Sequence, residues 1–282
     1  GELFGIVGPD GSGKTTTLRI LAGVLRPTDG DASVVGTSVV KDPEGVKHRI
    51  AYMSQRFGLY TDLSVRENIE FYADLYGVPR KARAKRLERL YAFSQLGQFE
   101  KRLAGALSGG MKQKLSLCCA LIHEPEVLLL DEPTFGVDPI SRRELWLIVH
   151  EMVANGMTAI VSTAYLDEAE RCDRVALLSK GKLAALDAPA ELQGRLRGRT
   201  IAIDSDSPVK AMEMMRAQSG VRSAALFGQS LHLTVHSQGQ ESELRALLEN
   251  GGVAVRSMHE LEPSLEDVFI DLSATEHSDH AN

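Results

Sequence analysis

A glycine-rich segment near the start of the chain narrows the possible folds sharply. Residues 8–15 (GPDGSGKT) fit the pattern GxxxxGK[ST]. An apolar, strand-like segment at residues 3–7 precedes them, and a helical pattern begins at Lys14. A strand, a glycine-rich turn and a helix in this order form a phosphate-binding loop. An ordinary glycine turn is the alternative, but a chance match is roughly a 1% event at ordinary glycine usage.

The residue types in this loop suit a nucleotide phosphate. Glycines let the backbone curl so that successive N–H groups point inward at phosphate oxygens. The helix that begins near Lys14 adds the positive end of its dipole. Lys14 can reach the β- and γ-phosphates, and the Thr15 hydroxyl can ligate Mg²⁺. We therefore assign nucleotide binding to the loop residues Gly8, Pro9, Asp10, Gly11, Ser12, Gly13, Lys14, Thr15 and Thr16.

Two carboxylates follow a continuous apolar run much later in the chain. The run at residues 127–130 is typical of a strand buried on both faces, and Asp131 and Glu132 come directly after it. Ligands bind at this end of parallel strands. Asp131 is suited to hold Mg²⁺ and Glu132 to polarise an attacking water. An acidic turn would explain the pair equally well in isolation, but the phosphate loop favours the catalytic interpretation.

Strands that alternate with helices predict a mostly parallel α/β sheet up to about residue 195. Beyond residues 194–199 the pattern becomes βαββαβ, which is the split, ferredoxin-like arrangement of a small α+β domain. A helix is expected at 264–272, and the polar residues 273–282 are expected to be a linker or tail. The other elements expected in the first part are a strand and turn at 31–40, strands at 48–55 and 158–163, helices at 64–96 (broken by Pro79), 108–123, 139–155 and 165–172, and a hairpin at 174–186 that turns at Lys180-Gly181.

Charge and apolar content limit the partners. The 282 residues carry a formal net charge of −6, which argues against a protein that binds mainly the nucleic-acid backbone. One basic run, residues 80–89 (RKARAKRLER), stands out. We favour a solvated helix face for it, and proximity to anionic lipid is the alternative. No stretch approaches the roughly 18 apolar residues of a membrane span.

The three cysteines point to a reducing compartment. Cys118, Cys119 and Cys172 show no CxxC spacing, and the adjacent pair inside a helical pattern would form a disulfide only under strain. A cytosolic chain with buried, structural thiols therefore fits best.

Together with one further motif, these sites resemble the ATP-binding cassette (ABC) ATPases of transporters, which are P-loop NTPases. Residues 107–113 (LSGGMKQ) match the family's signature sequence, with Met111 where glutamine is commoner. Gln55 fits the Q-loop, and Asp138 fits the D-loop. The resemblance covers residues 1–195 and implies a helical subdomain at about residues 56–125. The signature residues are Leu107, Ser108, Gly109, Gly110 and Met111.

The rest of the chain is similar to one branch of this family. Residues 263–272 (PSLEDVFIDL) resemble the accessory domain of ABC-2 type exporter ATPases. The stretches FGLYTDLSVRENI and VDPISRRELW resemble the first half of a bacterial tandem ATP-binding subunit for multidrug export. The resemblance implies an accessory domain at 199–272, and a tail at 273–282 that links to a second cassette. It also implies a peripheral location on the cytoplasmic face of the bacterial inner membrane.

The family's logic implies roles, cofactors and partners. Cassettes form head-to-tail dimers with two ATP molecules at the interface, so the expected cofactors are ATP and Mg²⁺. Glu132 and Gln55 would be catalytic, and Thr15, Gln55 and Asp131 would hold the metal. Ser108 and Gly110 would reach the γ-phosphate of the opposite site. The expected partners are a second nucleotide-binding domain in the same full-length chain and ABC-2 transmembrane subunits, which residues 56–63 would meet. No nucleic acid is expected.

The sequence departs from the family pattern in two places. Ala164 stands where the family has a switch histidine that contacts the γ-phosphate. Loss of one such contact is worth about 2.7–4 kcal/mol, by analogy with an oxyanion donor, so slow hydrolysis is expected at the site of Glu132. Nothing in this sequence precedes Gly1, where the family has early strands and an adenine-stacking aromatic residue. We therefore expect weak nucleotide binding and an incomplete β subdomain for this exact chain.

Three functions remain open from the sequence. The leading one is an ABC exporter ATPase that couples Mg-ATP binding and hydrolysis to transport through separate membrane subunits. The second is a degenerate half that binds ATP without turnover and completes its partner's site; Ala164 favours it and Glu132 argues against it. The third is an ABC protein of translation or repair, which the acidic charge and the exporter-like C-terminal part disfavour.

Overall fold

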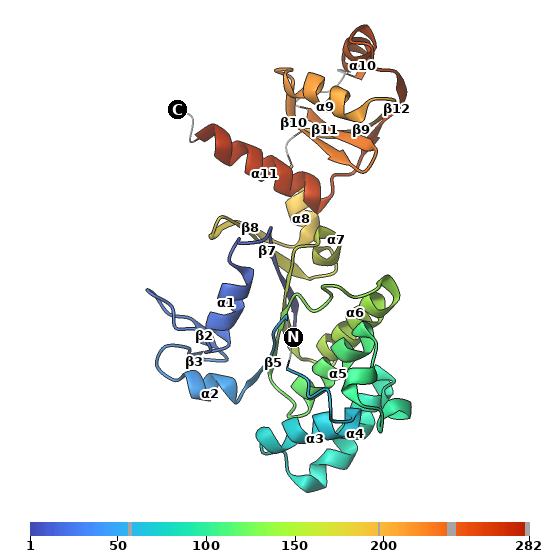
Figure 1. The fold of residues 1–282 in the computed structure, drawn as a ribbon. Coiled ribbons are helices and arrows are strands. Elements are labelled where there is room, and N and C mark those ends of the chain that lie inside the picture. The colour runs from blue at the N-terminus through green and yellow to red at the C-terminus, as the bar shows by residue number, and fades with distance from the viewer. Residues whose placement is uncertain (56–57, 197, 236–240, 280–282) are drawn as a thin grey trace. The chain divides into compact units, whose positions relative to one another are not determined.

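The computed structural model describes residues 1–55, 58–196, 198–235 and 241–279 (Figure 1). Its contacts divide the chain into two units. The first comprises Gly1–Tyr165 and Cys172–Lys182, and the second comprises Leu166–Arg171 and Leu183–Asn282. No helix among the described residues is both long and apolar enough to cross a membrane.

The first unit is built on a mostly parallel sheet, as the alternation of strands and helices predicts. Its strand order is β4-β5-β6-β1-β7-β8, and each neighbouring pair from β4 to β7 is parallel. All five residues of β5 are buried, which explains its continuous apolar sequence. The strands are β1 (Leu3–Val7), β4 (Ile50–Met53), β5 (Val127–Asp131), β6 (Thr158–Thr163), β7 (Arg174–Ser179) and β8 (Lys182–Asp187).

Helices cover both faces of this sheet. Figure 1 shows α1 (Lys14–Leu21) on one face, and α5 (Gly109–Leu121) and α6 (Pro139–Ala154) on the other. The segment 31–40, predicted as strand and turn, forms a small hairpin of β2 (Ser33–Val34) and β3 (Thr37–Ser38), and α2 (Pro43–Lys47) follows it. Val35 and Gly36 between them have φ values of 50° and 76°, which is the left-handed backbone of a tight hairpin turn.

A helical region follows β4. It holds α3 (Val65–Leu75) and α4 (Arg80–Ser94), and the break predicted at Pro79 lies between them. Two short 3₁₀ turns, Gly97–Phe99 and Ala104–Ala106, lead to α5. A capping box begins α3: the Ser64 hydroxyl accepts the Glu67 N–H, and the Glu67 carboxylate accepts the Ser64 N–H.

The second unit has its own antiparallel sheet, with strand order β10-β11-β9-β12. Eleven buried residues, among them Ile203, Leu231 and Leu233, form its apolar core. The chain follows the predicted βαββαβ order. The elements are α7 (Leu166–Ala169), α8 (Pro189–Gly194), β9 (Arg199–Ser205), α9 (Pro208–Arg216), β10 (Val221–Phe227), β11 (Ser230–Val235), α10 (Glu241–Asn250), β12 (Val255–Leu261) and α11 (Leu265–Asp279).

Two helices differ in length from the sequence pattern. The helix expected at 165–172 is only α7, because the chain must turn to enter β7, where Asp173 exchanges two hydrogen bonds with the Leu3 backbone. In contrast, α11 continues past Leu272 to Asp279, into the segment expected as a tail. That segment contains no glycine or proline to end a helix.

Candidate nucleotide-binding site

The glycine-rich loop connects β1 to α1 at the carboxyl end of the sheet. A Cβ on Gly8 would collide with the Leu178 carbonyl oxygen of β7 and with the Ser12 hydroxyl, so only glycine fits there. Gly11 and Gly13 have φ values of 77° and 105°, which side chains rarely adopt. The loop therefore has the close packing and backbone shape expected of a phosphate cradle, and α1 begins directly behind it.

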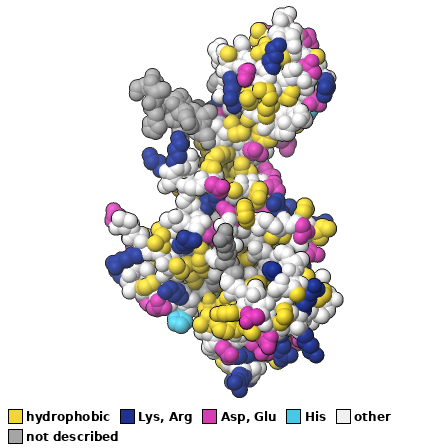
Figure 2. Space-filling model, viewed as in Figure 1, with side chains coloured by type: hydrophobic (Ala, Val, Ile, Leu, Met, Phe, Trp, Pro, Cys, Tyr) yellow, Lys and Arg dark blue, Asp and Glu magenta, His cyan; other side chains and the backbone are white. Residues whose placement is uncertain are grey.

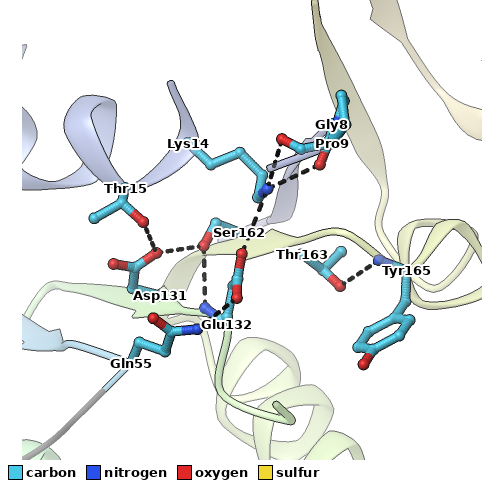
Figure 3. A network of polar contacts seen from close by, with 10 residues as sticks. All are labelled: Gly8, Pro9, Lys14, Thr15, Gln55, Asp131, Glu132, Ser162, Thr163 and Tyr165. Carbon is cyan, nitrogen blue, oxygen red and sulfur yellow. Dashed lines mark hydrogen bonds and ion pairs between the residues drawn. The ribbon is translucent and has the colours of Figure 1, made fainter. Parts of the chain in front are cut away.

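Lys14 folds back over this loop (Figure 3). Its Nζ donates hydrogen bonds to the carbonyl oxygens of Gly8 (2.8 Å) and Pro9 (3.1 Å). The same Nζ lies 3.4 Å from Glu132 Oε1, and the Lys14 side chain is only 4% exposed. The lysine is thus held at the loop by three oxygen atoms, one of them from the catalytic carboxylate predicted from the sequence.

Asp131 is the centre of a second, buried network. Thr15 Oγ1 and Ser162 Oγ both donate to Asp131 Oδ1, at 2.9 and 2.7 Å. The Tyr52 hydroxyl donates to Asp131 Oδ2 at 3.2 Å. Burial raises the pKa of Tyr52, and the Asp131 charge raises it further, so this hydroxyl remains a donor. The three donors fix the orientation of the carboxylate.

Glu132 sits at a strained position directly after β5. Its φ is 47°, in the left-handed region, and its N–H donates to Ser162 Oγ at 3.0 Å. Gln55 Nε2 donates to Glu132 Oε2 at 2.8 Å, so the Q-loop position predicted from the sequence does reach the carboxylate. The cleft between these groups is lined by Asp10, Gly11, Gly13, Lys14, Thr15, Thr16, Gln55, Glu132 and Phe135.

The donor set of this cleft fits a magnesium nucleotide. Mg²⁺ prefers hard oxygen ligands and binds through one or two carboxylates together with substrate phosphates. The Thr15 hydroxyl and the Asp131 carboxylate lie within 2.9 Å of each other and supply such oxygens. The Gln55 side chain lines the same cleft. The glycine-rich loop and the start of α1 supply the positive end of a helix for the phosphates.

The signature residues begin α5. Ser108 is its N-cap, and its hydroxyl accepts the Met111 N–H at 3.3 Å. A Cβ on Gly110 would collide with Ser141 of α6, whereas a Cβ on Gly109 would meet nothing within 4 Å. From the sequence, Gly110 was expected to reach the γ-phosphate of the opposite site. The packing of α5 against α6 already requires glycine at position 110, and Gly109 is the exposed one.

Asp138 caps the neighbouring helix. Its Oδ1 accepts the N–H groups of Ser141 (3.0 Å) and Ile140 (3.1 Å) at the start of α6. Hydrogen bonds to the carboxylate lower the pKa of Asp138, and the bond from the Ser141 N–H has the largest effect. Among the described residues, no hydrogen bond joins Asp138 or the signature residues to the network of Lys14 and Asp131. The structure therefore has a cleft around Lys14 and Asp131, and a separate surface formed by the first residues of α5 and α6.

The switch position lies after β6. Ala164 is exposed and offers no polar group. The Thr163 hydroxyl accepts the Tyr165 N–H at 3.0 Å, and the Arg142 guanidinium lies 4.5 Å from the centre of the Tyr165 ring. Figure 3 shows this ring pointing away from Lys14. Of the segment expected to meet a membrane subunit, Arg56 and Phe57 lie outside the described residues, and Tyr60 is an exposed aromatic residue.

Sequence reasoning missed two residues that hold the carboxylates. Ser162 joins Asp131 to the backbone of Glu132, and Tyr52 donates to Asp131. The available signal was the register of parallel strands: Ser162 lies directly opposite Asp131. A serine that follows the apolar residues of one strand, beside a strand that ends in a carboxylate, marks such a partner.

Two domain families match the chain. The family described as "ABC transporter" matches residues 1–135. The family described as "ATP-binding protein DrrA1-3-like, C-terminal domain" matches residues 188–273.

Full-length relatives and a solved structure agree with these matches. The probable multidrug ABC transporter ATP-binding protein YbhF of Escherichia coli K12 is 44% identical over 96% of this chain and 47% of its own length. The chain thus spans about half of this relative. The daunorubicin/doxorubicin resistance ATP-binding protein DrrA of Streptomyces peucetius is 33% identical over 97% of this chain and 84% of DrrA. A solved ATP-binding subunit of an ABC transporter has a TM-score of 0.62 at 30% identity, over 69% of this chain and 81% of that one.

Proposed function

We propose that this chain, which belongs to the ATP-binding proteins of ABC transporters, binds Mg-ATP and couples its binding and hydrolysis to export through separate membrane subunits. Within the family it belongs to the DrrA- and YbhF-like ABC-2 multidrug exporters. ATPases of this family hydrolyse ATP in step with transport, and they dimerise and pair with membrane subunits.

One observation carries the proposal. The loop lysine, Lys14, the carboxylate Glu132 and the amide of Gln55 meet in one cleft beside the Thr15–Asp131 pair. The contributing residues lie far apart in the sequence, and their meeting in one cleft supports the proposal. A strand that merely ended in an acidic turn would not bring Glu132 within reach of both Lys14 and Gln55.

Different residues of the cleft would perform different parts of ATP hydrolysis. Loop N–H groups and Lys14 would bind the phosphates, and Lys14 would exchange its contact with Glu132 for the β- and γ-phosphates. Thr15, Asp131 and Gln55 would hold Mg²⁺, which when bound neutralises charge on the phosphate oxygens. Glu132, released from Lys14 and oriented by Gln55, would then accept the proton of the attacking water.

A second cassette is the proposed partner of the exposed surface at the starts of α5 and α6. Ser108 and Gly109 are exposed there, and Ile140 beside Asp138 is 74% exposed. Ser108, with its hydroxyl at the N-terminus of α5, would meet the γ-phosphate bound by the partner. The second cassette would lie in the same full-length chain, because YbhF is about twice as long as this one.

We propose the same domain limits and location that the sequence indicates. The cassette would occupy residues 1–195, with the helical subdomain at about 56–125. A ferredoxin-like accessory domain would occupy 199–272, supported by the βαββαβ order and the four-stranded antiparallel sheet. Residues 273–282 would lead toward the second cassette. The whole subunit would be peripheral to the cytoplasmic face of the inner membrane, bound to its transmembrane partners.

A degenerate, ATP-gated half is the second candidate, and Ala164 favours it. This residue is exposed and has no polar atom to contact a γ-phosphate. The missing contact is worth about 2.7–4 kcal/mol, on the order of 10²–10³ in rate. Such a half would bind ATP, close the dimer and contribute Ser108, while its partner performs the hydrolysis.

ATP binding and turnover of the complete subunit distinguish the two candidates. The second cassette carries an inactivating substitution of its own catalytic glutamate in every sample. We expect Lys14→Ala to abolish ATP binding, because the loop loses its cation. If the sample with no substitution in this half hydrolyses ATP and Glu132→Gln abolishes the hydrolysis, this half is a working ATPase. The exposed Glu213 of the second unit supplies a matched control, Glu213→Gln, which should leave turnover unchanged.

The opposite result supports the second candidate. If this half binds ATP without hydrolysing it, and Ala164→His restores some hydrolysis, this half is the degenerate, ATP-gated module. If Lys14→Ala leaves ATP binding unchanged, both candidates are wrong.

A further inference from the structure

The basic run in the helical region is only partly explained by ion pairs. Arg83 lies 2.6 Å from Asp74, Arg86 lies 2.6 Å from Glu124, and Arg89 lies 3.9 Å from Glu124. These pairs fix α4 against the rest of the first unit. They also separate the run into cations that have a structural partner and cations that do not.

Three cations on α4 have no such partner. Arg80, Lys81 and Lys85 are exposed, and within the described part of the chain no carboxylate forms an ion pair with them. They lie within the first two turns of one helix, so their charges stay close together. The chain as a whole carries −6, so this concentration of positive charge is a local feature.

Exposed apolar side chains adjoin these cations. Leu75 ends α3 with 64% of its surface exposed, and Tyr76 follows with 38%. Tyr76 is held in place, because its ring stacks on His123 with 3.9 Å between the centroids. Only residues 77–79 separate this pair from Arg80. Figure 2 shows Lys and Arg side chains along the edge of the face where α3 and α4 lie in Figure 1.

This combination fits the surface of an anionic membrane. Lys and Arg are attracted to anionic headgroups, and tyrosine favours the interface, where its ring meets the acyl boundary and its hydroxyl meets water. Long cationic side chains reach the headgroups while their stems cover apolar surface. A nucleic acid is a poorer fit, because its phosphate backbone would attract the cations but would offer no apolar layer to the exposed Leu75 side chain.

We propose that Arg80, Lys81 and Lys85, together with Leu75 and Tyr76, form a contact surface for anionic phospholipid headgroups. We call these five residues the lipid edge. The lipid edge would add a second, weaker attachment beside the transmembrane subunits and orient the helical region toward the bilayer. This goes beyond the proposed ATP-dependent function, because none of the five residues lines the nucleotide cleft.

Vesicle binding of the full chain without nucleotide tests this. The probes are phosphatidylcholine vesicles with and without phosphatidylglycerol. Each cation near an anionic surface contributes about 1 kcal/mol, or about fivefold in binding. We therefore expect Arg80→Gln/Lys81→Gln/Lys85→Gln to lower binding to the anionic vesicles by on the order of a hundredfold. Raising the salt from about 0.1 M to 1 M shortens the screening length from about 10 Å to 3 Å and should weaken wild-type binding.

A matched triple variant controls for net charge. Lys41→Gln/Lys182→Gln/Lys210→Gln removes the same charge from exposed positions outside α4 and should bind anionic vesicles like the wild type. Leu75→Ser should weaken the binding that remains at high salt. ATP binding of every variant should equal that of the wild type, which shows that the chain has folded and keeps the test independent of the cleft.

Several outcomes would overturn the lipid edge. One is equal binding of wild type to vesicles with and without phosphatidylglycerol. Another is an equal loss in the two triple variants, which would make net charge the cause. If only the α4 triple variant loses its transmembrane subunits in lipid-free detergent, and its vesicle binding is unchanged, the edge is a protein contact instead.

Discussion

Among single residues, Ser162 has the most consequential position that the sequence pattern does not reveal. Its hydroxyl donates to Asp131 Oδ1 and accepts the N–H of Glu132, and the residue is fully buried. One oxygen atom therefore ties the proposed metal ligand to the backbone of the proposed catalytic base. Glu132 needs this support, because its left-handed backbone is unfavourable for a residue with a side chain.

We expect Ser162→Ala to weaken the site without abolishing ATP binding. Removal of a positioning group behind a metal ligand typically costs 10–100-fold in metal affinity or activity. A buried carboxylate that loses a donor also costs about 1–3 kcal/mol of stability. The measurement is ATP turnover of the complete subunit as a function of Mg²⁺ concentration, with the second cassette inactivated. The half-saturating Mg²⁺ concentration should rise.

Two further variants separate positioning from general damage. Ser162→Thr keeps the hydroxyl and should restore the Mg²⁺ dependence. Ser219→Ala at an exposed position should change nothing. A lower stability with an unchanged Mg²⁺ dependence would make Ser162 a purely structural residue. If this half turns over no ATP, Mg²⁺-dependent ATP binding replaces turnover as the readout.

The sequence allowed prediction of residues that belong to continuous motifs. Lys14, Gln55 and Glu132 were found because each lies in a short pattern with a chemical reason, and the structure brings them together. Tyr52 and Ser162 could not be found in that way, because their role depends on which strands become neighbours. Gly110 was predicted from its motif, but its contact with Ser141 could not be predicted, because it depends on how two helices pack.

At the scale of elements, the end of α5 connects three parts of the first unit. His123 follows this helix, its Nε2 lies 3.0 Å from the Ile50 carbonyl oxygen of β4, and its ring stacks on Tyr76 after α3. Burial is the main cause that lowers the pKa of His123 below its ordinary value. The neutral imidazole, with Nε2–H donating to Ile50, is therefore the form that the fold prefers.

This preference predicts an acid-sensitive junction. The unfolded chain takes up a proton at His123 near the ordinary histidine pKa of about 6.5, and the folded chain only at lower pH. The stabilising contribution is thus present above about pH 6.5 and is lost as the pH falls toward the folded pKa. One such proton gives a slope of at most about 1.4 kcal/mol per pH unit.

Urea unfolding at about pH 7.5 and about pH 5.5, on either side of this value, measures the slope. His123→Gln keeps a donor for Ile50 but does not titrate, so its free energy of unfolding should fall less between the two pH values than that of the wild type. His259→Gln at an exposed position should behave as the wild type. Identical slopes for all three chains would contradict the assignment.

At the scale of the whole molecule, the two units differ in how far the sequence could predict them. The parallel sheet of the first unit follows from alternating strands and helices, and the strand lengths agree closely at β5 and β6. Segments without strong periodicity were less predictable. The hairpin of β2 and β3 is short because Val35 and Gly36 turn the chain at once, and the helix after Thr163 is short because Asp173 must reach Leu3.

The second unit has what an independent domain needs: its own four-stranded sheet and its own apolar core. We expect residues 183–279, produced alone, to unfold in one cooperative urea transition. A domain of this size has a free energy of unfolding on the order of 5 kcal/mol or more. Leu233 is fully buried, so Leu233→Ala should lower that value by about 2–5 kcal/mol.

The control for this prediction is Leu247→Ala, at a leucine that is 40% exposed, which should cost much less. A broad, non-cooperative transition of the isolated segment would show that its core is insufficient. Equal losses in the two leucine variants would show that Leu233 does not belong to a packed core in solution.

The position of β1 in the sheet has a consequence for protein synthesis. This strand is made before both of its neighbours, β6 and β7, which are encoded about 150 residues later. At about 5–20 residues per second, a ribosome needs roughly 8–30 s to supply them. During that interval the nascent strand has no partner on either edge, and the loop after it lacks the β7 carbonyl group against which Gly8 packs. A growing chain thus acquires its ability to bind nucleotide late and in one step, when translation passes β7.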